Sequence, residues 1–170
     1  MWVQTKPNRL GPYFVYQVVD SKTLEQRVYL ETGLHGTPQL IYRHFRGVTV
    51  LLGNKHMRLL VNDECSAKGN KVVVIDLPAA QQRDLGQGVV KKYDADVSHD
   101  PRCVLIPNGY AFSQDDARVL IKVEPIYVSS SSFKELSKVE KSYKPRWYVL
   151  DASTGGILKE YHTDHIPEEW

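Results

Sequence analysis

Short runs of apolar, aromatic and β-branched residues dominate the pattern of this chain, and most of them alternate with polar residues. Runs of about five to eight such residues, separated by Gly, Asn, Asp or Pro, are typical of β-strands. The pattern predicts strands at 13–19, 26–31, 38–45, 48–52, 57–62, 71–76, 88–93, 102–106, 118–123, 146–150 and 156–161. So many short strands at regular spacing predict a mainly β domain.

One of these runs differs from the others because it does not alternate. "KVVVID", residues 71–76, is apolar at consecutive positions. Side chains of a strand point to opposite faces in turn, so a strand with two apolar faces is expected to be covered on both sides. The run therefore predicts antiparallel sheets stacked in at least two layers.

A helical pattern interrupts the strands near residues 132–143. Ser132 and Glu135 have the spacing of a capping box, in which each side chain bonds a backbone N–H at the helix start. Three apolar residues then share one face: Phe133, Leu136 and Val139. Pro145 ends the pattern, and strands precede and follow it, so we expect one helix inserted into a hairpin. The segment "LPAAQQRDLGQG", 77–88, permits either a short helix from Pro78 or a long turn.

An Asp follows an apolar strand at three places, Asp20, Asp76 and Asp151. Such a carboxylate can accept backbone N–H groups two or three residues on and close a turn. After Asp151, either Gly155 or Gly156 can take the positive φ that a tight hairpin needs. We expect each Asp to begin an antiparallel hairpin.

The stretch "YVLDASTGGIL" resembles the outer hairpin of a β-propeller blade of the quinoprotein type. Upstream, "IPNGYAFSQDDARVLIKVE" resembles the inner part of such a blade. The resemblance covers roughly 101–161 and, more weakly, 57–85, and it implies sheets arranged as blades. The three aspartates lie further apart than the roughly 40–45 residues of a regular blade, and 170 residues are short for a ring of four or more blades. The expected fold is therefore a partial or open propeller-like array of stacked sheets.

Length and charge narrow the function classes. A chain of 170 residues with 42% hydrophobic and 25% charged residues fits one β-rich domain over 1–170. The net charge is only +2, and the basic residues are scattered among acids, which disfavours a nucleic-acid partner. No apolar run approaches the roughly 20 residues that cross a bilayer, so we expect no membrane span.

The two cysteines, Cys65 and Cys103, leave two alternatives open. They are either free thiols in a reducing compartment or a disulfide in an oxidising one. The N-terminus shows no secretory signal pattern. The expected location is periplasmic if a signal was removed and the disulfide forms, and cytoplasmic otherwise.

Two polar clusters are candidates for chemistry. Asp94, Asp96, His99 and Asp100 supply oxygen and nitrogen groups in one connection, but their spacing matches no calcium loop. A second cluster near the C-terminus contains His162, Asp164 and His165, and it lacks an evident third metal ligand. Solvated polar segments are the preferred interpretation of both. Nucleophile-elbow, phosphate-loop and dinucleotide motifs are absent from the sequence, so we predict no catalytic residues, no metal and no cofactor.

The sequence therefore favours a non-enzymatic protein-binding module, and one form of this hypothesis is a bacterial immunity protein that neutralises a secreted toxin. The loops 98–102 and 113–117 and the insertion 129–144 are the expected binding segments. The predicted partner-binding residues are His99, Asp100, Arg102, Asp115, Asp116 and Phe133. The alternatives are a metal-dependent hydrolase that uses one of the polar clusters, and a structural subunit or fragment of a larger propeller.

Overall fold

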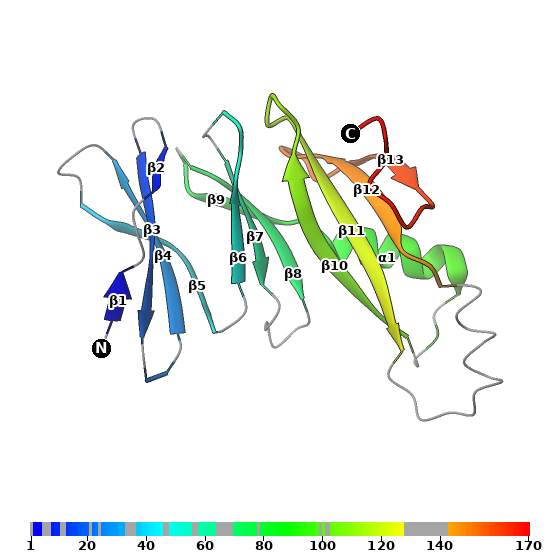
Figure 1. Ribbon diagram of the computed structural model, residues 1–170, viewed down its shortest axis with the longest axis horizontal. Helices are drawn as coiled ribbons and strands as arrows, with labels where there is room; N and C mark the ends of the chain where they lie inside the picture. The colour runs from blue at the N-terminus through cyan, green and yellow to red at the C-terminus, as the bar shows by residue number, and fades with distance from the viewer. Residues whose placement is uncertain are drawn as a thin grey trace.

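The protein consists of three antiparallel β-sheets that follow one another along the chain and stand side by side, as a computed structural model shows (Figure 1). The structure describes the chain except for residues 1, 5–7, 11–12, 21, 24, 33–36, 46–47, 56–57, 64–69, 78, 99, 101–102 and 128–142. Strand pairs within each sheet are almost all sequence neighbours, which is the order produced by consecutive hairpins.

The first sheet has the order β1-β3-β4-β5, with β2 paired to β3, and its strands are β1 (Trp2–Gln4), β2 (Asn8–Leu10), β3 (Tyr13–Asp20), β4 (Glu25–Thr32) and β5 (Gln39–Phe45). The second sheet contains β6 (Val48–Leu52), β7 (Arg58–Asp63), β8 (Lys71–Asp76) and β9 (Gln81–Asp84), in that order. The third sheet contains β10 (Cys103–Phe112), β11 (Arg118–Tyr127), β12 (Arg146–Asp151) and β13 (Ile157–Tyr161), and the helix α1 (Gly86–Val97) connects β9 to β10.

Strand β8 lies between two cores, as its continuous apolar run predicts. Val72 and Val74 belong to the core shared with the third sheet, whereas Val73 and Ile75 belong to the core shared with the first sheet. All four side chains are at least 96% buried. Because alternate residues of one strand face opposite neighbours, the middle sheet holds the other two in a stack.

The larger core lies between the second and third sheets and also takes in helix α1, which contacts β8, β10 and β11. Its members include Leu60 from β7, Val89 and Tyr93 from the helix, and Ile121 and Tyr148 from the third sheet. The smaller core joins the first and second sheets. Stacked antiparallel sheets confirm the predicted fold class.

The strand predicted at 88–93 is wrong, because this segment forms helix α1. Val89 and Tyr93 are four residues apart, so a helix turns both into the core. Gly86 permits the close approach of the helix start, since a Cβ there would lie 3.0 Å from Pro107. Leu85 at the N-cap makes no side-chain capping bond, so the usual sequence signal for a helix start is missing.

The ambiguous segment 77–88 is neither a helix from Pro78 nor one long turn. Asp76 and Gln81 pair across a hairpin that forms the short edge strand β9, and α1 starts directly after it. The helix predicted near 132–143 lies outside the described residues, so it stays a prediction. The strands that flank it, β11 and β12, are antiparallel neighbours, as expected of a hairpin.

The three aspartates do begin hairpins, but by two devices. The carboxylate of Asp151 accepts the N–H groups of Ser153 (2.9 Å) and Thr154 (2.7 Å), and Gly155 takes φ +75°. Asp20 accepts two N–H groups of its own turn in the same way. Asp76 instead directs its carboxylate sideways to two arginines, described below.

Candidate interaction surface

The third sheet has one face that packs on the rest of the protein and one that does not. Alternation along β10, β11 and β12 turns one set of side chains toward the second sheet and α1. The opposite set forms what we call the outer face, which carries Val104, Tyr110, Leu120, Lys122, Glu124, Ile126, Trp147 and Val149. The registers Val104↔Ile126, Leu120↔Val149 and Lys122↔Trp147 place these residues side by side.

Large apolar side chains remain exposed on this face. Val104, Tyr110 and Ile126 are 46%, 47% and 46% exposed, respectively. Single exposed apolar residues are ordinary, but several on one sheet face are typical of an interaction site. A hollow of about 530 Å³ adjoins the end of the face that carries Ile126, and it is lined by Glu124, Pro125, Ile126, Tyr143, Lys144, Pro145 and Asp164.

The position of Tyr110 is set by a contact with the second sheet. The buried Asn62 side chain donates to the Gly109 carbonyl (2.8 Å) and accepts the Gly109 N–H (2.7 Å). A β-bulge follows, because the register shifts between Gly109 and Ala111 and leaves Tyr110 without a partner on β11. A buried amide on one side of the sheet therefore fixes an exposed ring on the other side.

Trp147 is the centre of the outer face. Its side chain is 98% buried beneath the Tyr110 ring, which meets it edge-on at 5.2 Å, and beneath Lys122, whose Nζ lies 5.5 Å from the indole centroid. The indole Nε1 has no hydrogen-bond acceptor among the described residues. A buried donor without an acceptor costs about 1–3 kcal/mol, and such groups are uncommon in native proteins.

The C-terminal residues cover one part of the outer face. Trp170 and Tyr161 pack against Leu120, Trp147 and Val149, and the Arg118 guanidinium lies 5.8 Å from the Trp170 ring centroid. The ion pair between Lys159 and Glu169 holds the same segment. This cover does not bury Val104, Tyr110 or Ile126, which stay exposed.

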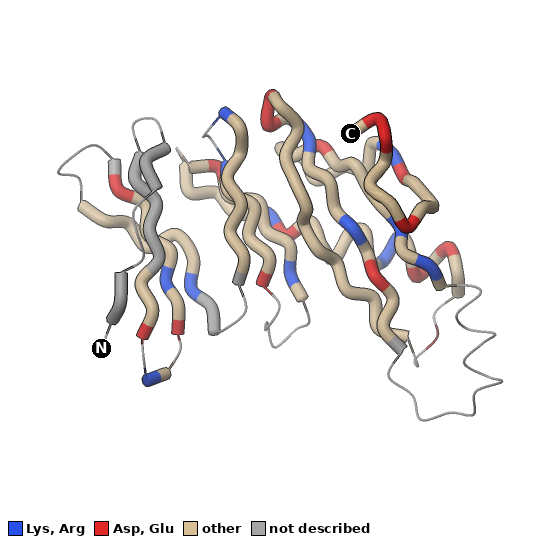
Figure 2. The backbone as a smooth tube through the Cα atoms, viewed as in Figure 1, with Lys and Arg blue, Asp and Glu red and all other residues tan. Residues whose placement is uncertain are grey.

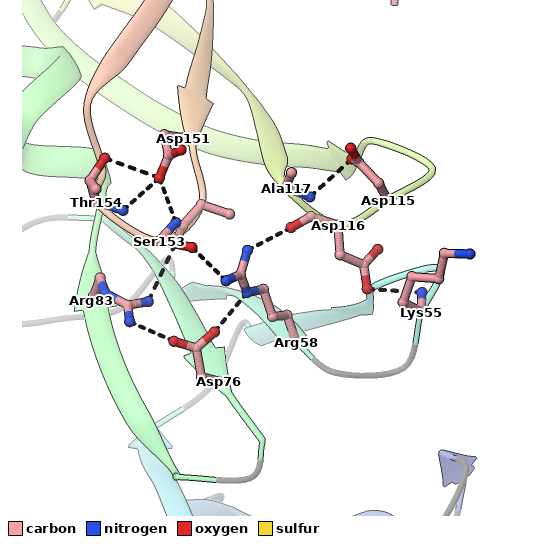
Figure 3. Close-up of polar contacts among 11 residues, drawn as sticks. Lys55, Arg58, Asp76, Arg83, Asp115, Asp116, Ala117, Asp151, Ser153 and Thr154 are labelled. Carbon is pink, nitrogen blue, oxygen red and sulfur yellow. Dashed lines mark hydrogen bonds and ion pairs between the residues drawn. The ribbon is translucent and has the colours of Figure 1, made fainter.

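The second and third sheets are also joined by a polar network at the β10–β11 turn (Figure 3). Asp116 is 97% buried, and its carboxylate accepts the N–H groups of Asn54 (2.5 Å) and Lys55 (2.8 Å) in the β6–β7 turn. Arg58 of β7 donates to the Asp116 carbonyl (2.7 Å) and to Ser153 Oγ (2.6 Å). We call this set the inter-sheet clamp.

Asp76 completes the clamp. Its carboxylate binds Arg58 Nε at 2.7 Å and Arg83 Nη2 at 2.5 Å, and Arg83 also reaches the carbonyl of Ala152 (Figure 3). Burial acts to raise the pKa of Asp76, but the hydrogen bonds from Arg83 and Arg58 outweigh it, so the pKa lies below its ordinary value. The carboxylate therefore stays ionised between its two partners.

The predicted partner-binding residues do not converge on one surface. Asp115 is exposed in the β10–β11 turn, where it accepts the Ser113 hydroxyl (2.6 Å), while the adjacent Asp116 is in the clamp. Asp100 lies before the other end of β10, roughly 30 Å away along a ten-residue strand. There its N–H donates to the Tyr143 hydroxyl at 2.8 Å. His99, Arg102 and Phe133 lie outside the described residues.

One member of each polar cluster considered for metal chemistry contacts charged neighbours instead. Asp96 binds Lys92 and Arg146, and Arg146 also binds Glu160 at 2.6 Å. His162 lies 3.2 Å from Glu160. His162 and His165 line a groove of about 460 Å³ together with Lys144, Pro145, Arg146, Thr163 and Asp164. Among the described residues, no group of three or more His, Cys, Asp or Glu side chains is placed to hold a metal ion.

Cys103 is a free thiol that is 94% buried at the start of β10. Burial, together with the nearby Asp100 and Asp94, raises its pKa to about 11. The thiolate is the reactive form of cysteine, so this thiol is held in its inert form. Cys65, the other half of the predicted alternative, lies outside the described residues.

Charge does not mark one face of the molecule. Figure 2 shows basic and acidic residues interspersed over the described parts of all three sheets. No helix in the described part of the chain is long and apolar enough to cross a membrane. Apolar exposure, and not charge, therefore distinguishes the outer face, and sequence reasoning missed this face because it depends on how β10, β11 and β12 pair.

Comparison with solved structures identifies the architecture. No protein-family model and no curated protein sequence matches the chain. The β-propeller domain of the Trilobed protease from Pyrococcus furiosus, described as having an open velcro topology, aligns with 97% of this chain at a TM-score of 0.54 and 11% identity. The Pyrococcus horikoshii acylaminoacyl peptidase aligns with 95% of it at 0.53 and 8% identity.

These likenesses concern the fold alone, because the sequence identities are low. The chain spans 44% of the first structure's length and 25% of the second's. The blade resemblance drawn from the "YVLDASTGGIL" hairpin is thus confirmed at the level of architecture. The three stacked sheets form a partial, propeller-like array.

Proposed function

We propose that this chain is a non-enzymatic protein-binding module that engages its partner through the outer face of the third sheet. One observation carries the proposal: Tyr110 is about half exposed against a buried tryptophan whose N–H has no acceptor among the described residues, and Val104 and Ile126 are about half exposed further along the same face. Aromatic residues with apolar neighbours are the usual anchors of protein interfaces.

Covering the exposed apolar area of this face contributes favourable binding energy. A tyrosine buries roughly 150–250 Å² when fully covered, so the 47% exposure of Tyr110 leaves roughly 70–120 Å² to be covered. At about 25 cal/mol per Å², covering this ring alone contributes about 2–3 kcal/mol. Val104 and Ile126, which are paired with each other further along the same face, add to it if the partner covers that end as well.

Site-specific photo-crosslinking tests the proposal. Benzoylphenylalanine at position 110 reports on the outer face, and the same residue at the exposed position 91 of α1 is the matched control. We expect a partner that is captured from position 110 but not from position 91, and whose capture is lost when Ile126→Glu is added. Equal capture from both positions, or capture insensitive to Ile126→Glu, would contradict the proposal.

A narrower form of the proposal is that the partner is a secreted toxin and the chain is a bacterial immunity protein. Its support is the small size, the lack of catalytic sequence motifs and the acidic loops that carry Asp100 and Asp115. The test is whether co-expression of this chain restores growth to cells that produce a toxin encoded beside its gene. Growth inhibition that is unchanged by co-expression would contradict the immunity-protein hypothesis without affecting the proposal of a protein-binding module.

A further inference from the structure

The stacking of the three sheets has a direction. The first sheet packs Val28 and Leu30 against one face of the second sheet. The second sheet then uses its opposite face, with Leu60 and Val74, against the third sheet. In each contact, the face that one sheet turns toward the next sheet of the chain packs on the face that this next sheet turns back toward it. The same head-to-tail arrangement is therefore used twice.

This arrangement leaves one unmatched face at each end of the stack. At one end it is the part of the outer face that the C-terminal residues leave uncovered, with Val104, Tyr110 and Ile126. At the other end it is the face of the first sheet that carries Tyr29 and Leu40, which are direct neighbours on β4 and β5 and alternate with the buried Val28 and Leu30. Leu40 is 40% exposed, and Arg43 on the same face is 55% exposed and paired with Glu25.

We propose that the partner of the outer face is a second copy of this chain, bound so that the third sheet of each copy stacks on the first sheet of the other. The inference rests on the proposed function, since it names the partner of the same surface. The proposed contact repeats the sheet-on-sheet packing that the chain already uses twice. It also covers both end faces of each copy at the same time.

Two copies bring together the number of sheets that a ring needs. Propellers close with four to eight blades, and three sheets from each copy give six. The propeller domain of which this chain spans 44% is also a little more than twice its length. A head-to-tail contact that closes at two copies satisfies every face and leaves no end for further growth.

Sedimentation velocity of the whole chain tests the inference. The monomer mass is 19.4 kDa, and we expect a species of twice that mass. Ile126→Glu on the third sheet and Leu40→Glu on the first sheet are each expected to weaken association by about tenfold or more. Lys91→Glu on the exposed side of α1 is the matched control and should leave the mass unchanged. Circular dichroism confirms that each variant is folded, and Val104→Glu replaces Ile126→Glu if that variant is not.

Mixing the two variants gives the sharpest result. Ile126→Glu has an intact first sheet and Leu40→Glu an intact third sheet, so the mixture should form a mixed dimer that neither variant forms alone. A dimer that is insensitive to Leu40→Glu would overturn the head-to-tail arrangement.

A wild-type chain that stays monomeric up to about 100 µM would overturn self-association altogether. In that case, crosslinking of a different protein from position 110 would still support the proposed function, and the absence of any crosslink would remove both.

Discussion

Asp116 offers the most direct test of how the second and third sheets are joined. Its buried carboxylate accepts the N–H groups of Asn54 and Lys55 across the sheet interface. A hydrogen bond to a charged group contributes about 1.5–3 kcal/mol. Asn54 and Lys55 are exposed, so water can replace part of the two lost hydrogen bonds. We therefore expect Asp116→Gly to lower the free energy of unfolding by about 3 kcal/mol.

Glycine is the right replacement because Asp116 has φ +60°. Glycine adopts this conformation without strain, so Asp116→Gly removes these bonds without adding backbone strain. Asp116→Ala should lose roughly 1–2 kcal/mol more, since alanine is strained in the left-handed region. Asp116→Asn keeps one acceptor oxygen and should lose less than Asp116→Gly.

Urea unfolding followed by circular dichroism measures these differences through the midpoint and the slope. The matched control is Asp115→Gly, which removes a carboxylate that bonds only within its own turn, to Ser113 and Ala117. The control should lose clearly less stability than Asp116→Gly. Equal losses at the two positions, or a loss at Asp116 below about 1 kcal/mol, would refute the inter-sheet role.

Three further predictions follow from single groups. Because the pKa of Asp76 is lowered, the stability that this carboxylate adds relative to Asp76→Asn is complete above the ordinary pKa of 3.8 and is lost as the pH falls through the lowered pKa. Unfolding of both proteins at about pH 6 and about pH 2.5 measures this. A stability difference between them that is the same at both pH values would contradict the prediction. In a Cys65→Ser background, Cys103 should react with a disulfide reagent at about pH 8 only after denaturation, and rapid labelling of the native protein would disagree. Gly155→Ala should destabilise the protein by roughly 1–2 kcal/mol because Gly155 has φ +75°. Gly88→Ala, in open space on α1, should stabilise it by up to about 1 kcal/mol. Thermal unfolding measures both, and a Gly155→Ala variant that is more stable than Gly88→Ala would contradict the prediction.

The sequence predicted those parts of the fold that depend on local pattern. The continuous apolar run of β8 predicted a strand covered on both faces, and the structure confirms it. The turns at Asp20 and Asp151 were predictable because the bonds that form them span only two or three residues. The blade resemblance rested on the same short-range features.

The sequence did not predict features that depend on contacts between distant residues. The sequence of helix α1 predicts a strand because the pair Val89 and Val90 imitates a β-branched run, whereas the core that favours the helix comes from other sheets. The acidic turn pattern around Asp116 predicts a partner-binding loop. The partners of Asp116 lie about 60 residues away in another sheet, and no local signal indicates them.

The candidate site was missed for a similar reason. Alternation along β10 puts Tyr110 on the same face as Val104, but the residues that meet it there, Lys122 and Trp147, belong to β11 and β12 and depend on strand register.

Hydroxyl-radical footprinting, read out by mass spectrometry at a range of protein concentrations, tests the central claim that the outer face of the third sheet is an organised but uncovered binding surface. In dilute protein, Tyr110 and Ile126 should be oxidised rapidly while the buried Trp147 is protected. As the chain associates, Tyr110 and Ile126 should become protected as well. Oxidation of Trp147 as fast as Tyr110 in dilute protein, or a Tyr110 rate that never changes in the presence of a partner or of more protein, would contradict the account.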